Sequence, residues 1–170
     1  KFITLGKEKE VVRLGESMTD MKHMQLEAML RALETLKRFT MIADSFHAPI
    51  RAVATSAVRE APNRDAFLDL IREGTGIEID FVSGYEEARL IYLGVLQALP
   101  IFEKDTLLFD IGGGSTEFLL GKQGKVRYAN SLKLGAIRLS RRYFHSKSTK
   151  DKEIFECRQA LRGALHPVKR

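Results

Sequence analysis

The sequence has 170 residues, of which 44% are hydrophobic and 29% are charged, with a formal net charge of +6. This length suits one domain or two small lobes with a buried core. No apolar run approaches the roughly 20 residues that a membrane-spanning helix needs, so we expect no membrane partner. The single cysteine, Cys157, excludes a disulfide framework and a cysteine zinc cluster, and it predicts a reducing, cytoplasmic location.

The basic residues are concentrated toward the end of the chain. Residues 133–170 contain 11 basic and 3 acidic residues, a surplus of 8, whereas residues 1–132 contain 17 basic and 19 acidic residues. A basic segment can steer a polyanion toward a site, but a solvated helix face explains the same pattern. Aromatic residues for base stacking are sparse there, so we expect no specific nucleic-acid partner.

Hydrophobic periodicity and turn residues predict the elements in chain order. The first half is predicted to contain strands at 2–5 and 11–14, a helix over 23–45 capped by Thr19 or Asp20, a strand at 50–54, a helix over 64–74 capped by Asn63, and a strand at 77–82. The second half is predicted to contain a helix over 85–96, two strands within 107–120, a strand at 126–132, a helix over 136–144 and a helix from Asp151, as its cap, to 165. Met24 and Met29 are interpreted as core fillers.

The chain centres on residues 107–120, which read Leu-Leu-Phe-Asp-Ile-Gly-Gly-Gly-Ser-Thr-Glu-Phe-Leu-Leu. Glycines let a ligand approach the backbone, and successive N–H groups at such a turn form an anion site. Asp110, at the end of a strand, suits a Mg²⁺ ion that shares phosphate oxygens. Glu117 breaks the dinucleotide fingerprint, and no Gly-Lys-Ser/Thr ending is present. A structural turn needs fewer glycines, so we interpret the corner as a phosphate loop.

Two further candidates precede this corner. Arg59 follows a short buried strand, and its guanidinium matches phosphate, although a solvated loop arginine is the simpler interpretation. Glu86 and Glu87 begin an almost wholly apolar helix, where they complement the helix dipole. Glu87 shares a face with Ile91, so its carboxylate should point toward packed protein or a cleft. A carboxylate there has a raised pKa and can act as a general base. These residues alone do not decide between Glu86 and Glu87.

Five stretches resemble, in order, the exopolyphosphatase/guanosine pentaphosphate phosphatase (Ppx/GppA) family, a branch of the actin–Hsp70–sugar kinase superfamily. They are Arg-Leu-Gly at 13–15, Ala-Thr-Ser-Ala-Val-Arg-Glu-Ala-Pro-Asn at 54–63, Ser-Gly-Tyr-Glu-Glu-Ala-Arg-Leu at 83–90, Asp-Ile-Gly-Gly-Gly-Ser-Thr-Glu at 110–117 and Leu-Gly-Ala-Ile-Arg-Leu at 134–139. The resemblance therefore spans nearly the whole chain.

The resemblance implies an α/β fold of ribonuclease-H-like lobes of the actin/Hsp70 type, with a mixed sheet flanked by helices. Residues 1–104 would form the first lobe without its opening strand, and residues 105–170 the truncated start of the second. The family's first phosphate loop, Asp-x-Gly-Ser-Asn-Ser, is absent from this sequence. We therefore expect a fragment of a longer protein, and the resemblance does not imply that these residues are active alone.

The resemblance also implies Mg²⁺-dependent hydrolysis of terminal phosphoanhydride bonds in inorganic polyphosphate, guanosine pentaphosphate or both. Glu87 would activate water, Glu117 would assist, and Asp110 would bind Mg²⁺. Phosphate would be bound by Arg59, Gly112, Gly113, Gly114 and Ser115. A homodimer of the full-length protein is compatible with this interpretation.

Two alternatives remain open. One is a non-catalytic module that senses polyphosphate or a phosphorylated nucleotide. The other is a phosphotransferase of the same superfamily, related to acetate or sugar kinases. The Glu-Glu-Ala-Arg stretch at 86–89 argues against the phosphotransferase, because a hydrolase needs a base for water.

Overall fold

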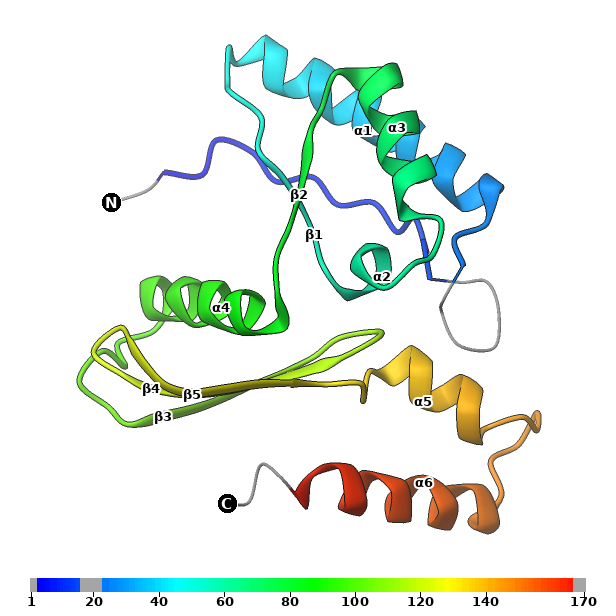
Figure 1. The fold of residues 1–170 in the computed structure, drawn as a ribbon. Helices are drawn as coiled ribbons and strands as arrows, with labels where there is room; N and C mark the ends of the chain where they lie inside the picture. Colours follow the sequence, from blue (N-terminus) through cyan, green and yellow to red (C-terminus); the bar gives the residue numbers. More distant parts are fainter. Residues whose placement is uncertain (1–2, 16–22, 167–170) are drawn as a thin grey trace.

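The structure, a computed structural model, describes residues 3–15 and 23–166 (Figure 1). It has a mixed α/β fold, as predicted. Its elements are α1 (Leu26–Ser45), β1 (Ala52–Ala54), α2 (Ser56–Arg59), α3 (Arg64–Thr75), β2 (Ile79–Phe81), α4 (Gly84–Ala98), β3 (Thr106–Ile111), β4 (Thr116–Lys122), β5 (Lys125–Leu132), α5 (Ala136–Tyr143) and α6 (Asp151–Ala164).

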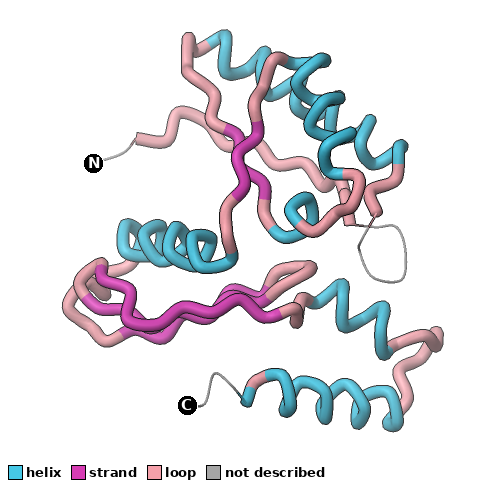
Figure 2. The backbone as a smooth tube through the Cα atoms, in the orientation of Figure 1, coloured by secondary structure: helices cyan, strands magenta, loops and turns pink. Residues whose placement is uncertain are grey.

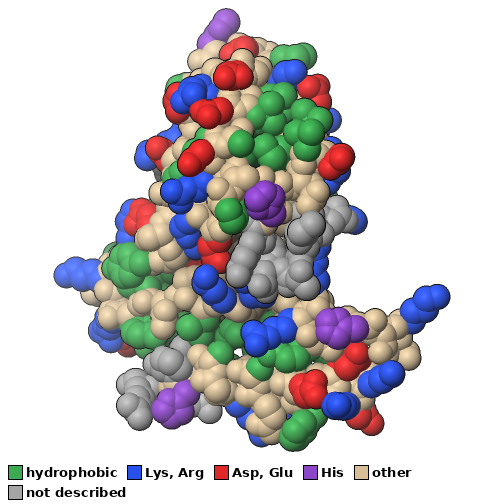
Figure 3. All heavy atoms as spheres, turned by 45° about the vertical axis from the view of Figure 1, so that its right-hand side comes forward, with side chains coloured by type: hydrophobic (Ala, Val, Ile, Leu, Met, Phe, Trp, Pro, Cys, Tyr) green, Lys and Arg blue, Asp and Glu red, His purple; other side chains and the backbone are tan. Residues whose placement is uncertain are grey.

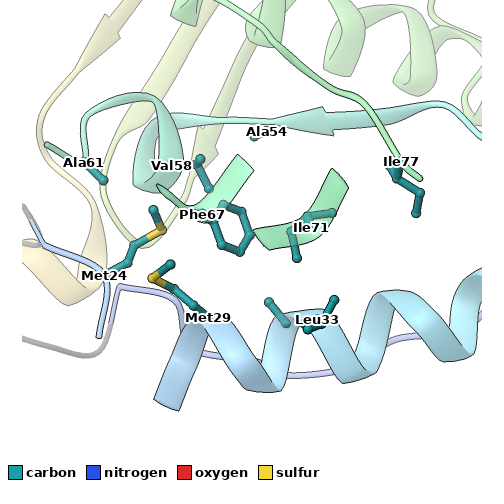
Figure 4. Packing of buried hydrophobic residues seen from close by; sticks show 10 residues of the cluster. Met24, Met29, Leu33, Ala54, Val58, Ala61, Phe67, Ile71 and Ile77 are labelled. Carbon is teal, nitrogen blue, oxygen red and sulfur yellow. The ribbon is translucent and has the colours of Figure 1, made fainter. Parts of the chain in front are cut away.

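The first half of the chain packs two helices beside a small parallel sheet. β1 pairs in parallel with β2, and α1 and α3 lie side by side next to this pair (Figure 1). Between them is a buried cluster that includes Met29, Leu33, Phe67 and Ile71 (Figure 4). Met24 and Met29 both belong to this cluster, which confirms their prediction as core residues. The cluster supports β1, whose carboxyl end leads toward Arg59.

The strands predicted at 2–5 and 11–14 are wrong for the described part of that segment. Residues 3–15 form no strand, because a strand needs a partner for its backbone hydrogen bonds. A groove of about 330 Å³, lined by Val12 and Leu14 on one side and by β1 on the other, separates this segment from the nearest strand. Val12 and Leu14 still pack partly against the buried cluster. The hydrophobic pattern therefore predicts correctly that these two side chains are partly buried, although their segment forms no strand.

Helix caps also differ from the prediction. Thr19 and Asp20 lie outside the described residues, and α1 begins after Gln25, whose side chain makes no capping hydrogen bond. Asn63 occupies the N-cap position of α3 as predicted, but its side chain makes no capping hydrogen bond. Its side-chain oxygen accepts from the Met24 N–H at 3.0 Å, and its amide donates to the Met24 carbonyl at 2.8 Å. Asn63 thus joins the starts of the two packed helices.

The N-terminal residue of α6 is Asp151, so Lys150 takes the N-cap position predicted for Asp151. The Glu153 carboxylate accepts hydrogen bonds from the backbone N–H groups of Lys150 at 3.0 Å and His145 at 3.1 Å. A carboxylate in the third helical position therefore satisfies these two amides, whereas the predicted cap would have accepted from amides of the first helical turn.

β3, β4 and β5 form an antiparallel sheet, in that order, and α4 covers one face of it (Figures 1 and 2). Ala88 and Tyr92 of α4 and Leu119 of β4 are fully buried at this contact. The predicted helix over 85–96 is confirmed and is slightly longer. The lobe boundary between residues 104 and 105 stays a prediction.

Two glycines let α4 lie directly on this sheet. A Cβ added to Gly84 would lie 2.3 Å from the Cβ of Ser131, and one added to Gly121 would lie 2.7 Å from the Tyr92 ring. Both distances are far shorter than a van der Waals contact, so a larger side chain would force helix and sheet apart. The first and third turns of α4 are therefore fixed against β5 and β4.

α5 and α6 contact each other beyond the end of the sheet (Figure 1), and Cys157 is buried and unpaired. Basic and acidic side chains are interspersed over the face drawn in Figure 3, with apolar side chains exposed between them. Among the helices of the described residues, none has the length and apolar character that crossing a membrane requires.

The Gly84 contact predicts a stability difference between two glycines of one helix. We expect Gly84→Ala to lower the free energy of unfolding by about 1–3 kcal/mol, the usual cost of overpacking. Gly94→Ala is the matched control, since nothing lies within 4 Å of the added Cβ. Alanine favours helix, so the control should gain up to about 1 kcal/mol. Urea denaturation measures both, and equal gains would contradict the close contact.

Candidate functional site

The glycine corner, Gly112–Ser115, joins β3 to β4 and is closed by one internal hydrogen bond. The Gly112 N–H donates to the Ser115 carbonyl at 2.9 Å. The three glycine carbonyls accept hydrogen bonds from the backbone N–H groups of residues 135–138, at 2.8 to 3.2 Å. A Cβ on Gly135 would lie only 2.3 Å from Gly113 backbone atoms, so this approach requires glycine at 135. The start of α5 therefore holds the carbonyl side of the corner.

The N–H groups of the corner face the opposite way. A trans peptide holds its N–H opposite its C=O, and no described peptide bond is cis. The amides of Gly113, Gly114 and Ser115 therefore point away from α5, and none of them donates to a backbone acceptor within the described residues. Successive amides of this kind can bind an anion. Gly113 and Gly114 also line a cavity of about 490 Å³ together with Thr55 and with Ile137 and Arg141 of α5.

The two hydroxyl residues after the glycines are buried. Thr116 donates its hydroxyl to the Leu134 carbonyl at 3.1 Å, which joins the base of the corner to the chain after β5. This bond assigns Thr116 a structural role rather than a phosphate contact. Ser115 is buried as well, and its backbone supplies one of the three outward-facing amides.

Asp110 and Glu117 lie opposite each other across β3 and β4. Residues opposite in an antiparallel pair point to the same side of the sheet, and here that side is the one covered by α4, because Leu119 packs there. Glu117 is 1% exposed, and its Oε1 accepts a hydrogen bond from the Ser131 hydroxyl at 2.7 Å. Asp110 is half-buried. Two facing carboxylates repel unless a cation or a proton is shared.

Glu87 lies in the first turn of α4, where Ser83 caps the helix by accepting from the Glu86 N–H at 3.1 Å. Burial raises the pKa of the Glu87 carboxyl, and the nearby Glu117 carboxylate raises it further, while Arg59 and Thr55 act in the opposite direction. The buried Oε2 of Glu87 has no hydrogen-bond partner among the described residues. The carboxylate is thus poised to accept a proton.

The neighbouring carboxylate has a different environment. Glu86 accepts two hydrogen bonds from the Arg89 guanidinium, both at 2.7 Å. The hydrogen bond from Arg89 lowers the pKa of Glu86. The proton affinity of Glu86 is therefore reduced, whereas that of Glu87 is increased. This difference favours Glu87 as a general base.

Arg59 is the last residue of α2 and lies between the two halves of the site. Its Nη1 donates to the Val82 carbonyl at 2.6 Å and lies 3.6 Å from Oε2 of Glu87. The Val82 bond holds the guanidinium beside the start of α4. The remaining guanidinium N–H groups can bind an anion that enters next to Glu87.

The carboxylate oxygens of Asp110 and Glu117 are of the chemical type that binds Mg²⁺. Among the described residues there is no group of three His, Cys, Asp or Glu side chains that is ready to hold a metal ion. The carboxylates of Asp110 and Glu117 nevertheless share one face, and Mg²⁺ is usually bound by one or two carboxylates, several waters and substrate phosphates. Asp110 as its ligand stays a prediction.

Sequence reasoning missed three residues of this region, namely Ser131, Glu60 and Arg138. Ser131 is a polar residue on the inward face of β5, and that position was the available signal. The side chains of Glu60 and Arg138 meet at 3.2 Å across 78 residues, a contact that no local pattern predicts.

Comparisons with known proteins agree on one family. The sequence profile of the Ppx/GppA phosphatase family matches residues 1–170. The chain is 37% identical over 142 residues to a bifunctional 3-dehydroquinate synthase/phosphatase from Fusobacterium nucleatum, a match that covers 81% of this chain and 21% of that protein.

Two crystallised relatives have the same fold. An exopolyphosphatase from Cytophaga hutchinsonii matches with a TM-score of 0.92 and 34% identity, over 98% of this chain and 54% of that one. The PPX-GPPA enzyme of Aquifex aeolicus matches with a TM-score of 0.74 and 29% identity, over 94% of this chain and 53% of that one. These likenesses confirm the predicted fold class. The chain spans about half the length of both structures.

The raised pKa of Glu87 predicts a pH-dependent stability difference. The folded state binds this proton more tightly than the unfolded chain, so ionising Glu87 costs stability as pH rises from the ordinary value of 4.5 through the folded pKa. We expect the free energy of unfolding of the wild type, relative to Glu87→Gln, to fall as pH rises above 4.5 and through the folded pKa. Denaturant titrations across this range measure the difference.

Glu86→Gln is the control with the opposite sign. Because the Glu86 pKa is lowered, its ionised form contributes stability that is present above the ordinary carboxyl pKa and is lost as pH falls. A parallel pH trend for the two variants would show that their environments are not distinct.

Proposed function

We propose, because the chain belongs to the Ppx/GppA phosphatase family, that it takes part in Mg²⁺-dependent hydrolysis of terminal phosphoanhydride bonds. The substrates would be inorganic polyphosphate, guanosine pentaphosphate or both. The chain spans about half the length of its solved relatives, so the activity proposed is that of the full-length protein.

One observation carries this proposal: a buried Glu87 oxygen that accepts no hydrogen bond within the described residues lies 3.6 Å from Arg59 Nη1 and near the Glu117 carboxylate. A buried carboxylate without a hydrogen bond is costly to maintain. Perturbed carboxylates of this kind are found preferentially at catalytic sites, because a raised pKa improves a general base near neutral pH. A module that only binds phosphate has no need of such a base.

In the proposed reaction, the three outward-facing amides of the glycine corner bind the terminal phosphoryl group. Arg59 binds the same group or its neighbour, and Glu87 takes a proton from the attacking water. Glu117, held by Ser131, keeps negative charge next to Glu87 and so helps to maintain its proton affinity. Mg²⁺ held by Asp110 would neutralise phosphate charge when bound. Donors fixed in advance stabilise the charge that develops in the transition state.

We expect Glu87→Gln to lower kcat for phosphate release from polyphosphate by about 10²–10⁴-fold, the usual contribution of a general base. Substrate affinity should change little, because glutamine keeps the shape of the side chain. Phosphate release and equilibrium binding are measured on the full-length protein with Mg²⁺.

Glu86→Gln is the matched control and should retain wild-type turnover, because Glu86 is occupied by Arg89. If Glu86→Gln loses turnover and Glu87→Gln keeps it, the assignment of the base is wrong. A wild type that binds polyphosphate and guanosine pentaphosphate but releases phosphate from neither would identify a sensor instead.

The proposed metal ligand predicts a shift in Mg²⁺ requirement. Asp110→Asn removes the charge but keeps an oxygen donor, so a higher Mg²⁺ concentration should be needed for half-maximal turnover, by about tenfold or more. Chelation of Mg²⁺ should abolish turnover of the wild type. Turnover that persists in excess chelator would exclude the Mg²⁺ requirement.

A further inference from the structure

One arginine outside the predicted site bridges the two halves of the molecule. Arg138 lies in the first turn of α5, and its side chain is 17% exposed. Its Nε donates to the Gly114 carbonyl at 2.8 Å, and its Nη2 donates to the Glu60 carboxylate at 3.2 Å. One guanidinium therefore contacts both the glycine corner and the residue that follows α2.

The bond to Gly114 acts on the peptide group between Gly114 and Ser115. Because this group is planar, a carbonyl held toward α5 holds the Ser115 N–H on the opposite side. Glycine at 114 places few steric limits on rotation of this peptide. Within the described residues, the Gly135 N–H also donates to this carbonyl, at the longer distance of 3.2 Å. The hydrogen bond from Arg138 is thus the shorter of the two that hold the Gly114 carbonyl, and so of the two that set the direction of the Ser115 N–H.

The bond to Glu60 ties the same guanidinium to the residue next to Arg59. Glu60 also pairs with Lys133 at 3.0 Å, but the Lys133 side chain is 70% exposed, so water and salt weaken that pair. The less exposed pair with Arg138 is screened less. A planar guanidinium can direct two bonds at once, whereas a lysine ammonium is a single point of charge. The geometry therefore requires arginine at this position.

We propose that Arg138 is a positioning residue for the phosphate site. It keeps the Ser115 N–H facing the substrate, and through Glu60 it keeps the Arg59 segment in register with the glycine corner. This inference rests on the proposed function, because the orientation of the corner matters only if the corner binds phosphate. Arg138 acts through Gly114 and Glu60 and makes no contact with the substrate.

The test uses the full-length protein with tripolyphosphate and Mg²⁺. Arg138→Met removes both bonds and keeps much of the side-chain length. We expect the dissociation constant to rise and kcat to fall, each about tenfold, less than the ~10²–10³-fold that losing a whole transition-state donor costs. Glu60→Gln leaves the Gly114 bond in place and should show a smaller loss of the same kind. All assays are run below the melting transition of each variant.

Two further variants separate geometry from charge. Arg138→Lys keeps the charge but not the planar guanidinium with its two directed bonds. It should therefore restore less than half of the affinity and kcat lost in Arg138→Met, measured on a logarithmic scale. Arg142→Met removes a charge from the same helix at an exposed residue next to Tyr143. It should behave like the wild type.

Four results would overturn the inference. Unchanged affinity and kcat in Arg138→Met would show that Arg138 does not position the corner. Wild-type behaviour of Arg138→Lys, or an equal loss in Arg142→Met, would assign the effect to charge alone. A wild-type protein that neither binds nor hydrolyses tripolyphosphate would overturn the proposed function and this inference with it, which distinguishes that failure from the other three.

Discussion

The close packing of α4 on the β4–β5 hairpin determines the geometry of the whole site. Gly84 and Gly121 have no side chain, and a larger residue at either position would force helix and sheet apart. The start of the helix can then approach the inward face of the sheet, so Glu87 lies close enough to Glu117 for their charges to interact. α4 also follows β2 directly, and Arg59 donates to the chain between them. One helix therefore brings the acidic and basic parts of the site together.

The site concentrates negative charge that the fold must hold in place. Glu117 is nearly inaccessible and lies opposite Asp110. Burial raises the pKa of Glu87, and the Glu117 carboxylate raises it further. Such an arrangement disfavours the folded state unless neighbouring groups compensate. Ser131 and Arg59 supply part of the compensation within the protein. The rest of the compensation can come from a bound cation or from a proton.

Local chemistry explains what could be predicted from the sequence. The glycine corner, the helix that carries Glu87 and the core methionines follow from spacing and residue type, and the structure contains all three. The predicted strand at 11–14 failed because its hydrophobic pattern specifies burial but not a hydrogen-bonding partner. The Glu60–Arg138 pair was missed because its two residues meet only after the chain has folded. The sequence pattern therefore predicted these local elements better than it predicted contacts between residues that are far apart in the chain.

The contact between α5 and the glycine corner has an electronic consequence. Hydrogen bonds that run in series polarise one another, and each glycine carbonyl in the corner accepts from the positive end of α5. Electron density in each of these peptide groups is drawn toward its oxygen, so the N–H on the other side becomes a stronger donor. The field of this short helix would thus reach an anion bound at the corner through the peptide bonds of the corner, without contact between that anion and a helical amide.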